Sequence, residues 1–185
     1  IWGALTTELA DQAQRFGSVL AFPPDIGPFA AIESHSAQSK ADFEALLWHR
    51  KAPLMTHEAD TGPVPGAAAE TTVAGVQMTL TAPTTHACPF EVEELGNDDA
   101  GDILALASDT KPGPFERRTH TLGTFIGIRK DGALVAMAGQ RLKLPGYTEI
   151  SAVCVAKAHR GQGFGAALVR QLSERICDSG DVPFL

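Results

Sequence analysis

Apolar residues in the first part of the chain recur mostly at helical spacing. They predict a helix that ends at Gly17, with apolar positions at Leu5, Leu9, Ala13 and Phe16. The capping-box pattern of residues 39–42 predicts a second helix, because it precedes apolar residues that share one face. Residues 61–69 and 79–89 are rich in Gly, Pro, Ala and Thr, which is typical of linkers. We therefore expect a small helix-rich module with its linker over residues 1–85 and a second domain over residues 86–185.

The second part of the chain alternates between strand and helix patterns. Asp131-Gly132 supplies the positive φ angles of a tight hairpin turn, and Pro145-Gly146 makes another turn. The loop over 110–119 holds two prolines and a glycine, which exclude a continuous helix. The predicted strands are 71–80 (closing the first module), 90–93, 125–129, 133–142, 147–155 and 182–185, and the predicted helices are 98–108, capped by Asn97, and 163–179. Such a mixture predicts an α/β fold.

Composition and charge narrow the classes of function. The chain has 185 residues and a net charge of -7, which argues against nucleic-acid binding because that affinity depends on neutralising phosphates. Its three cysteines form no CxxC pair, so neither a metal site nor a disulfide framework is expected. Apolar runs are too short to predict a membrane span, and the first residues do not resemble a signal peptide. These features predict a cytoplasmic protein without a membrane partner.

A glycine-rich loop lies between the last long strand and the last helix. Its sequence, His159-Arg160-Gly161-Gln162-Gly163-Phe164-Gly165-Ala166, places three glycines at alternate positions. Unpaired backbone N–H groups at a helix start suit an anion such as a pyrophosphate. Residues 129–170 contain seven basic and two acidic residues, a local excess that favours a polyphosphate ligand or else forms a solvated face.

Three nucleotide-binding loops could explain these glycines. A P-loop is excluded, because the Lys-Ser/Thr that follows its last glycine is absent. The Rossmann pattern GxGxxA is met by Gly161, Gly163 and Ala166, but only nineteen residues follow Ala166, too few for the remaining βα units. Arg160-x-x-Gly163-x-Gly165, between a strand and a helix, resembles the acyl-coenzyme A loop of the GNAT acyltransferase superfamily.

Further segments resemble the FR47-like branch of that superfamily. They are residues 110–115, Arg118-Thr119, Gly123-x-Phe125-x-Gly127-Ile128 and residues 147–154. The resemblance implies a mixed, mostly antiparallel sheet flanked by helices. Relatives continue with a further helix and a hairpin, so the C-terminal elements of the fold are expected to be missing from this sequence, and the strand at 182–185 is expected to need a partner at its edge.

The resemblance also implies a binding site and a reaction. Acetyl-CoA would be bound, without a metal ion, by Val153, Cys154, Val155, Arg160, Gly161, Gln162, Gly163, Phe164, Gly165 and Ala166. Glu149 lies eleven residues before Arg160, the spacing of a catalytic glutamate in one branch, and is the candidate general base. Alternatively, Glu149 is a solvent-exposed residue that ends a turn and has no catalytic role. The acceptor amine would approach the loop at 110–119, where Lys111, Glu116 and Arg117 could meet its polar groups.

Three functions remain open at this point. The first is an N-acetyltransferase that transfers an acetyl group from acetyl-CoA to a small-molecule or protein amine by direct attack. The second is a catalytically silent CoA-binding regulatory or remnant domain, and the third is an interaction module without CoA. The sequence identifies neither the acceptor amine nor the oligomeric state. A homodimer is one candidate for the oligomeric state.

Overall fold

The structure is a computed structural model that describes residues 1–56, 64–80 and 88–185, and it divides into two compact units, Ile1–Val76 and Gln77–Leu185. The predicted boundary at residue 85 falls within residues 81–87, outside the described part, and stays a prediction. No helix among the described residues is both long enough and apolar enough to cross a membrane. Each unit has its own hydrophobic core.

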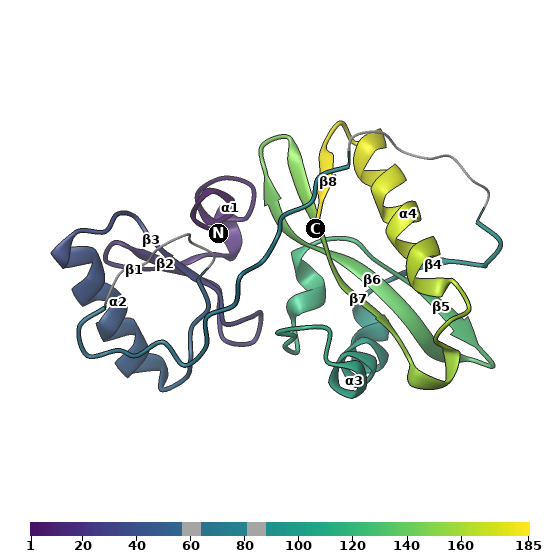
Figure 1. The fold of residues 1–185 in the computed structure, drawn as a ribbon, viewed down its shortest axis with the longest axis horizontal. Helices are drawn as coiled ribbons and strands as arrows, with labels where there is room; N and C mark the ends of the chain where they lie inside the picture. Colours follow the sequence, from purple (N-terminus) through teal and green to yellow (C-terminus); the bar gives the residue numbers. More distant parts are fainter. Residues whose placement is uncertain (57–63, 81–87) are drawn as a thin grey trace. The chain divides into compact units, whose positions relative to one another are not determined.

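The first unit packs helices against a small antiparallel sheet (Figure 1). Its elements are α1 (Trp2–Thr6), a 3-10 turn (Ala10–Gln12), β1 (Gln14–Phe16), β2 (Val19–Ala21), β3 (Ala30–Ile32) and α2 (Ala37–Arg50). Its helix-rich character is confirmed, but the helix predicted as far as Gly17 is wrong beyond Thr6. The pair Gly17-Ser18 forms the turn of a hairpin in which Phe16 pairs with Val19, and Gly17 has φ +59°.

The start of α2 differs from its prediction. Ser36 caps this helix, because its hydroxyl accepts the Ser39 N–H at 3.1 Å, so Ser39 does not begin the capping box. Asp42, expected in that box, instead accepts hydrogen bonds from the Ser18 backbone N–H at 2.9 Å and the Ser18 hydroxyl at 2.8 Å. These bonds lower the pKa of Asp42 and tie α2 to the β1–β2 turn.

The second unit is a five-stranded sheet with strand order β4-β5-β6-β7-β8. Its elements are β4 (Glu93–Leu95), a 3-10 turn (Asn97–Asp99), α3 (Ala100–Thr110), a 3-10 turn (Thr119–Leu122), β5 (Phe125–Lys130), β6 (Ala133–Leu144), β7 (Tyr147–Val155), a 3-10 turn (Lys157–His159), α4 (Phe164–Asp178) and β8 (Val182–Phe184). Neighbouring strands are antiparallel except β7 and β8, which are parallel. The predicted α/β class, with a mostly antiparallel sheet flanked by helices, is confirmed.

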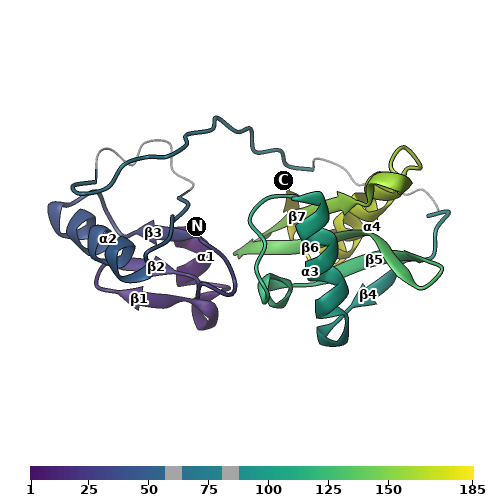
Figure 2. The same ribbon diagram turned by 90° about the horizontal axis from the view of Figure 1, so that it is seen from below.

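Helices α3 and α4 cover opposite faces of this sheet (Figure 2). Leu168, Leu172 and Ile176 of α4 pack against alternate residues of β5 and β6, as their spacing predicts. Ile103 and Leu106 of α3 pack against the other face. Both faces of the sheet are therefore covered by helices, and a ligand can reach the sheet only at its edges and strand ends.

Two predicted features of this unit need correction. The first strand runs from Glu93 to Leu95 rather than from Phe90 to Glu93. Asn97 does not cap α3, since its side-chain oxygen pairs with His120 Nε2 at 3.1 Å, and the preceding turn is closed by the Gly96 N–H donating to Asp99 at 2.9 Å.

The segment around Thr79 belongs to the second unit and does not close the first. Thr79 bridges Phe184, and the N–H and C=O groups of Met78 both bond Leu185, at 2.9 Å each. The free edge of β8 expected from the sequence thus receives a partner from residues 78–80.

Candidate acyl-CoA site

Strand β7 leaves its neighbour β8 after the first three of its nine residues. Its pairing with β8 covers only Tyr147–Glu149, and no other described strand pairs with residues 150–155 on that side. Ala152 lies in a β-bulge with φ +52°, where the register with β6 shifts. Backbone groups of Val153 and Val155 therefore lie on a strand edge that has room for an extended ligand.

The glycine loop begins where this edge ends. Gly161 has φ +77° and Gly163 has φ +86°, so both adopt the left-handed conformation that glycine accepts without strain. The first hydrogen bond of α4 runs from the Ala167 N–H to the Gly163 carbonyl at 3.0 Å. The N–H groups of Phe164, Gly165 and Ala166 precede that bond and stand at the positive end of the helix dipole, as an anion requires.

Side chains around the loop fix its shape and add positive charge. Arg160 is exposed and donates from Nε to the Val155 carbonyl at 3.1 Å, which ties the loop to the end of β7. Phe164 is 2% exposed, stacks with His159 and meets the Phe90 ring edge-on at a centroid distance of 4.8 Å. Lys130 Nζ lies 5.7 Å from the centre of the Phe164 ring. Phe164 is thus an anchor of the loop rather than an exposed binding group.

Cys154 points into the core between the sheet and α3. Burial raises the pKa of its thiol and outweighs the lowering caused by a side-chain hydrogen bond with Thr110 and by the Arg160 charge. The Cys154 side chain is therefore a neutral part of the core.

Glu149, the predicted base, lies at the last paired position before β7 leaves β8. It is 7% exposed, so the alternative of an exposed turn end is wrong. Its two carboxylate oxygens accept hydrogen bonds from Arg141, at 2.9 Å from Nε and 2.6 Å from Nη2. A bidentate pair of this kind holds the carboxylate in one orientation.

Sequence reasoning missed Arg141 because a β-bulge sets its direction. The turn at residues 145–146 pairs Leu144 with Tyr147, and continuing that register would pair Arg141 with Ile150. Instead the register shifts between Gln140 and Lys143, so Gln140 pairs with Ile150 and Arg141 lies on the face of Glu149. The one available signal was a charged residue two positions after the apolar run of residues 133–139 in the same strand.

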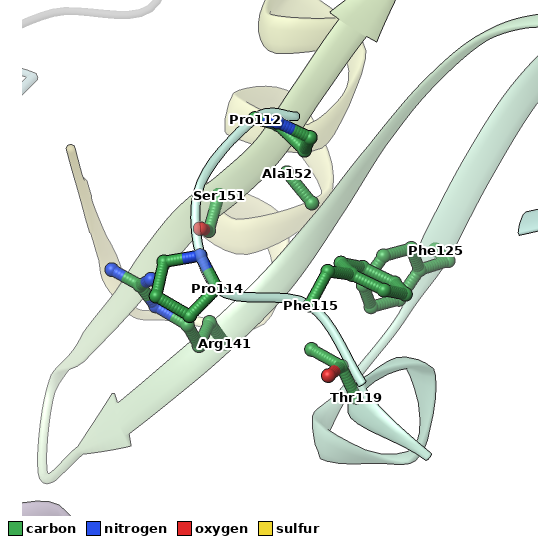
Figure 3. Close-up of a pocket in the computed structure, with 8 residues that line it drawn as sticks. All are labelled: Pro112, Pro114, Phe115, Thr119, Phe125, Arg141, Ser151 and Ala152. Atoms are coloured by element: carbon green, nitrogen blue, oxygen red, sulfur yellow. The ribbon is translucent and has the colours of Figure 1, made fainter. Parts of the chain in front are cut away.

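A small pocket lies beside this pair (Figure 3). The loop at 110–119 lines it with Pro112, Pro114, Phe115 and Thr119, and the sheet lines it with Phe125, Arg141, Ser151 and Ala152. The predicted contact residues Lys111, Glu116 and Arg117 belong to the same loop but are exposed and do not line the pocket. The proline and phenylalanine side chains of this loop, which line the pocket, were not singled out from the sequence, and the role of the loop in acceptor binding stays a prediction.

The chain is similar to proteins of known family and structure. Residues 125–185 match the model of the family described as FR47-like protein. A GNAT-family protein from Novosphingobium aromaticivorans is similar over 100% of this chain and 82% of its own, with 29% sequence identity and a TM-score of 0.80. The chain has the GNAT fold. The predicted resemblance to the FR47-like branch of the GNAT superfamily is confirmed.

Other acetyltransferase structures are similar over about half of the chain. The ribosomal-protein-S18-alanine N-acetyltransferase of Escherichia coli has 17% identity and a TM-score of 0.43, over 49% of this chain and 61% of its own. A GNAT-family acetyltransferase of Brucella melitensis, solved with acetyl-CoA, has 16% identity and a TM-score of 0.41, over 51% and 73%. No curated protein sequence matches the chain.

Proposed function

We propose that this protein is an N-acetyltransferase that transfers the acetyl group of acetyl-CoA to a small-molecule or protein amine. The observation that carries the proposal is the continuous path from the open edge of β7 to the glycine loop. The unpaired N–H groups of Phe164, Gly165 and Ala166 suit the CoA pyrophosphate, with Arg160 adding positive charge. Main-chain groups of Val153 and Val155 would bond the pantetheine arm.

The proposed reaction is direct attack of the amine on the thioester carbonyl. The new N–C bond forms, the C–S bond breaks, and the CoA thiolate leaves. Aligning the two reactants supplies most of the acceleration, so the protein needs no covalent intermediate. The acceptor is proposed to enter beside the loop at 110–119, where Lys111, Glu116 and Arg117 are exposed.

Glu149 is the proposed acceptor of the amine proton, directly or through a water molecule. Its position at the point where β7 leaves β8 supports this role, since a thioester on the open edge would end nearby. Arg141 holds the carboxylate by both oxygens, and each oxygen retains a second lone pair for the proton. Glu149 is buried and Arg141 is mostly buried, which limits competition from solvent.

The same ion pair favours a second candidate function. Both carboxylate oxygens of Glu149 are already bonded to Arg141, and a domain in which Glu149 serves only this ion pair would bind CoA without turnover. This candidate is a catalytically silent CoA-binding regulatory domain.

One experiment tests both candidates. Acetyl-CoA affinity is measured by calorimetry, and release of free CoA thiol is followed with a panel of small amines and amine-terminated peptides. We expect binding and amine-dependent thiol release. Binding without release for any amine supports the silent domain, and the absence of binding contradicts both candidates.

A further inference from the structure

The pocket beside Arg141 is small and has mostly apolar walls. Its volume is about 10 Å³, and Pro112, Pro114 and Phe115 close one side of it (Figure 3). Phe125 and Ala152 form apolar parts of the opposite side, on the sheet. A cavity of this size has room for about one water-sized group, and its walls favour an alkyl group over a polar one.

Two phenylalanine rings that line this pocket contact each other. Phe115 and Phe125 meet edge to face, with ring centroids 5.9 Å apart and an interplanar angle of 83°. The Phe125 ring is fixed in turn, because it is 2% exposed and lies where a Cβ atom at Gly139 would come within 2.3 Å of it. The Phe115 ring is partly exposed and belongs to the loop, so it is the adjustable wall.

The pocket also stands where an acyl group would arrive. Ser151 and Ala152, which line it, follow directly after Ile150 on the open part of β7, and Ala152 lies in the bulge. A thioester that followed this edge from the glycine loop would bring its acyl carbon to these two residues. The alkyl part of the acyl group would then face Phe115 and Phe125.

We propose that this pocket receives the alkyl part of the acyl group and that Phe115 restricts it to acetyl. The inference rests on the proposed binding of a CoA thioester and names the acyl donor that this site selects. A methyl group fits the available space, whereas each added methylene would have to displace the Phe115 ring or leave the pocket.

The first measurement compares acetyl-, propionyl- and butyryl-CoA with the wild-type chain. We expect kcat/KM for propionyl-CoA to be about 10- to 200-fold below that for acetyl-CoA, the usual discrimination for one methylene group in a fitted pocket. Butyryl-CoA should be poorer still. The same order is expected in binding, so calorimetry with the three thioesters gives a readout that needs no turnover.

The second measurement uses Phe115→Ala, which enlarges the pocket by removing the ring on its loop side. We expect the ratio of propionyl to acetyl kcat/KM to rise by at least about tenfold. Phe16→Ala is the matched control, because Phe16 is a partly buried phenylalanine of the first unit. It should leave the ratio unchanged, and thermal unfolding of both variants shows whether each remains folded.

The outcomes separate this inference from the proposed function. Equal use of all three thioesters by the wild type, or a ratio that Phe115→Ala leaves unchanged, overturns the inference even if transfer occurs. Binding that weakens with chain length and is relieved in Phe115→Ala supports the inference even if no amine is acetylated. If Phe115→Ala does not fold, the wild-type chain-length profile alone decides.

Discussion

The parts of the candidate site at the two ends of β7 differ in how many segments of the chain contribute to them. At the Val155 end, the features that suit CoA come from one short run, residues 159–166, whose glycines and helix start act through the backbone. At the Glu149 end, the ion pair and the pocket combine residues from β5, β6, β7 and the loop at 110–119. The first end is therefore a local property of the sequence, and the second exists only after the sheet has formed.

The sharpest test of this division removes the proposed base. Glu149→Gln should lower kcat by about 10²- to 10⁴-fold, the usual contribution of a positioned base, while the Kd for acetyl-CoA stays the same. Steady-state kinetics and calorimetry check the two halves of this prediction. A parallel loss of CoA affinity would show that the two ends of β7 are not independent.

A double variant provides the control for Glu149→Gln, which leaves Arg141 with a poorer partner. In Arg141→Met/Glu149→Met, an apolar pair replaces the buried ion pair, and such replacements are often neutral or stabilising. We expect a free energy of unfolding close to that of the wild type and turnover as low as in Glu149→Gln. Retained turnover in the double variant would remove Glu149 from the mechanism.

The glycine loop is tested by changing one backbone position. Gly163→Asp should raise the Kd for acetyl-CoA by about 100-fold or more, because a side chain at φ +86° is strained and the new charge repels the pyrophosphate. Gly163→Asn has a similar shape and similar backbone strain without the charge, so its loss of affinity should be smaller, about tenfold or less. Equal losses in the two variants would mean that charge at this position does not matter.

A second arginine on the sheet should affect stability without affecting either end of β7. Arg129 donates to Glu93 at 2.5 Å, to Asp99 at 2.6 Å and to Asp102 at 2.7 Å, joining β4, α3 and β5. These interactions raise the pKa of Arg129. Arg129→Met should lower the free energy of unfolding by roughly 1–3 kcal/mol, since each partly exposed pair contributes about 0.2–1 kcal/mol. Urea unfolding measures the change in the free energy of unfolding. A change in the affinity for acetyl-CoA in the same variant would contradict the prediction.

The smallest expected effect concerns the pH dependence of Cys154. Its thiol pKa is raised in the folded chain above the ordinary value of 9.0, so the neutral thiol favours the folded state. This contribution is present below pH 9 and is lost as the pH rises through the folded pKa. The difference in the free energy of unfolding between wild type and Cys154→Ala should therefore shrink as the pH is raised above 9. Urea unfolding at several pH values measures this difference. A difference that grows with pH would show that Cys154 ionises readily in the folded chain.

Local signals in the sequence predicted most of the second unit. Strand β7 has its predicted bounds, and α4 agrees within one residue at each end. The turn at Asp131-Gly132 has the expected positive φ angles, 50° and 80°. Such features depend on residues that are close in the chain, and the sequence is therefore sufficient to predict them.

The first unit shows where local reasoning failed. Its first seventeen residues satisfy a helical spacing, but Gly17-Ser18 is also a hairpin signal, and burial of β2 between its neighbours decides in favour of the sheet. The residues of β1 are too few for periodicity to separate the two structures. Tertiary packing overrides a weak local preference in this segment.

The sequence by itself determined the glycine loop, the hairpin turns of the second unit and the helix that follows the loop, because backbone conformation at glycine and helix starts depends on neighbouring residues. Only the tertiary structure decided that Arg141 faces Glu149 and that Phe115 meets Phe125. One residue more or less in the pairing of β6 with β7 would turn Arg141 to the other face of the sheet. That register is fixed by packing across the whole sheet.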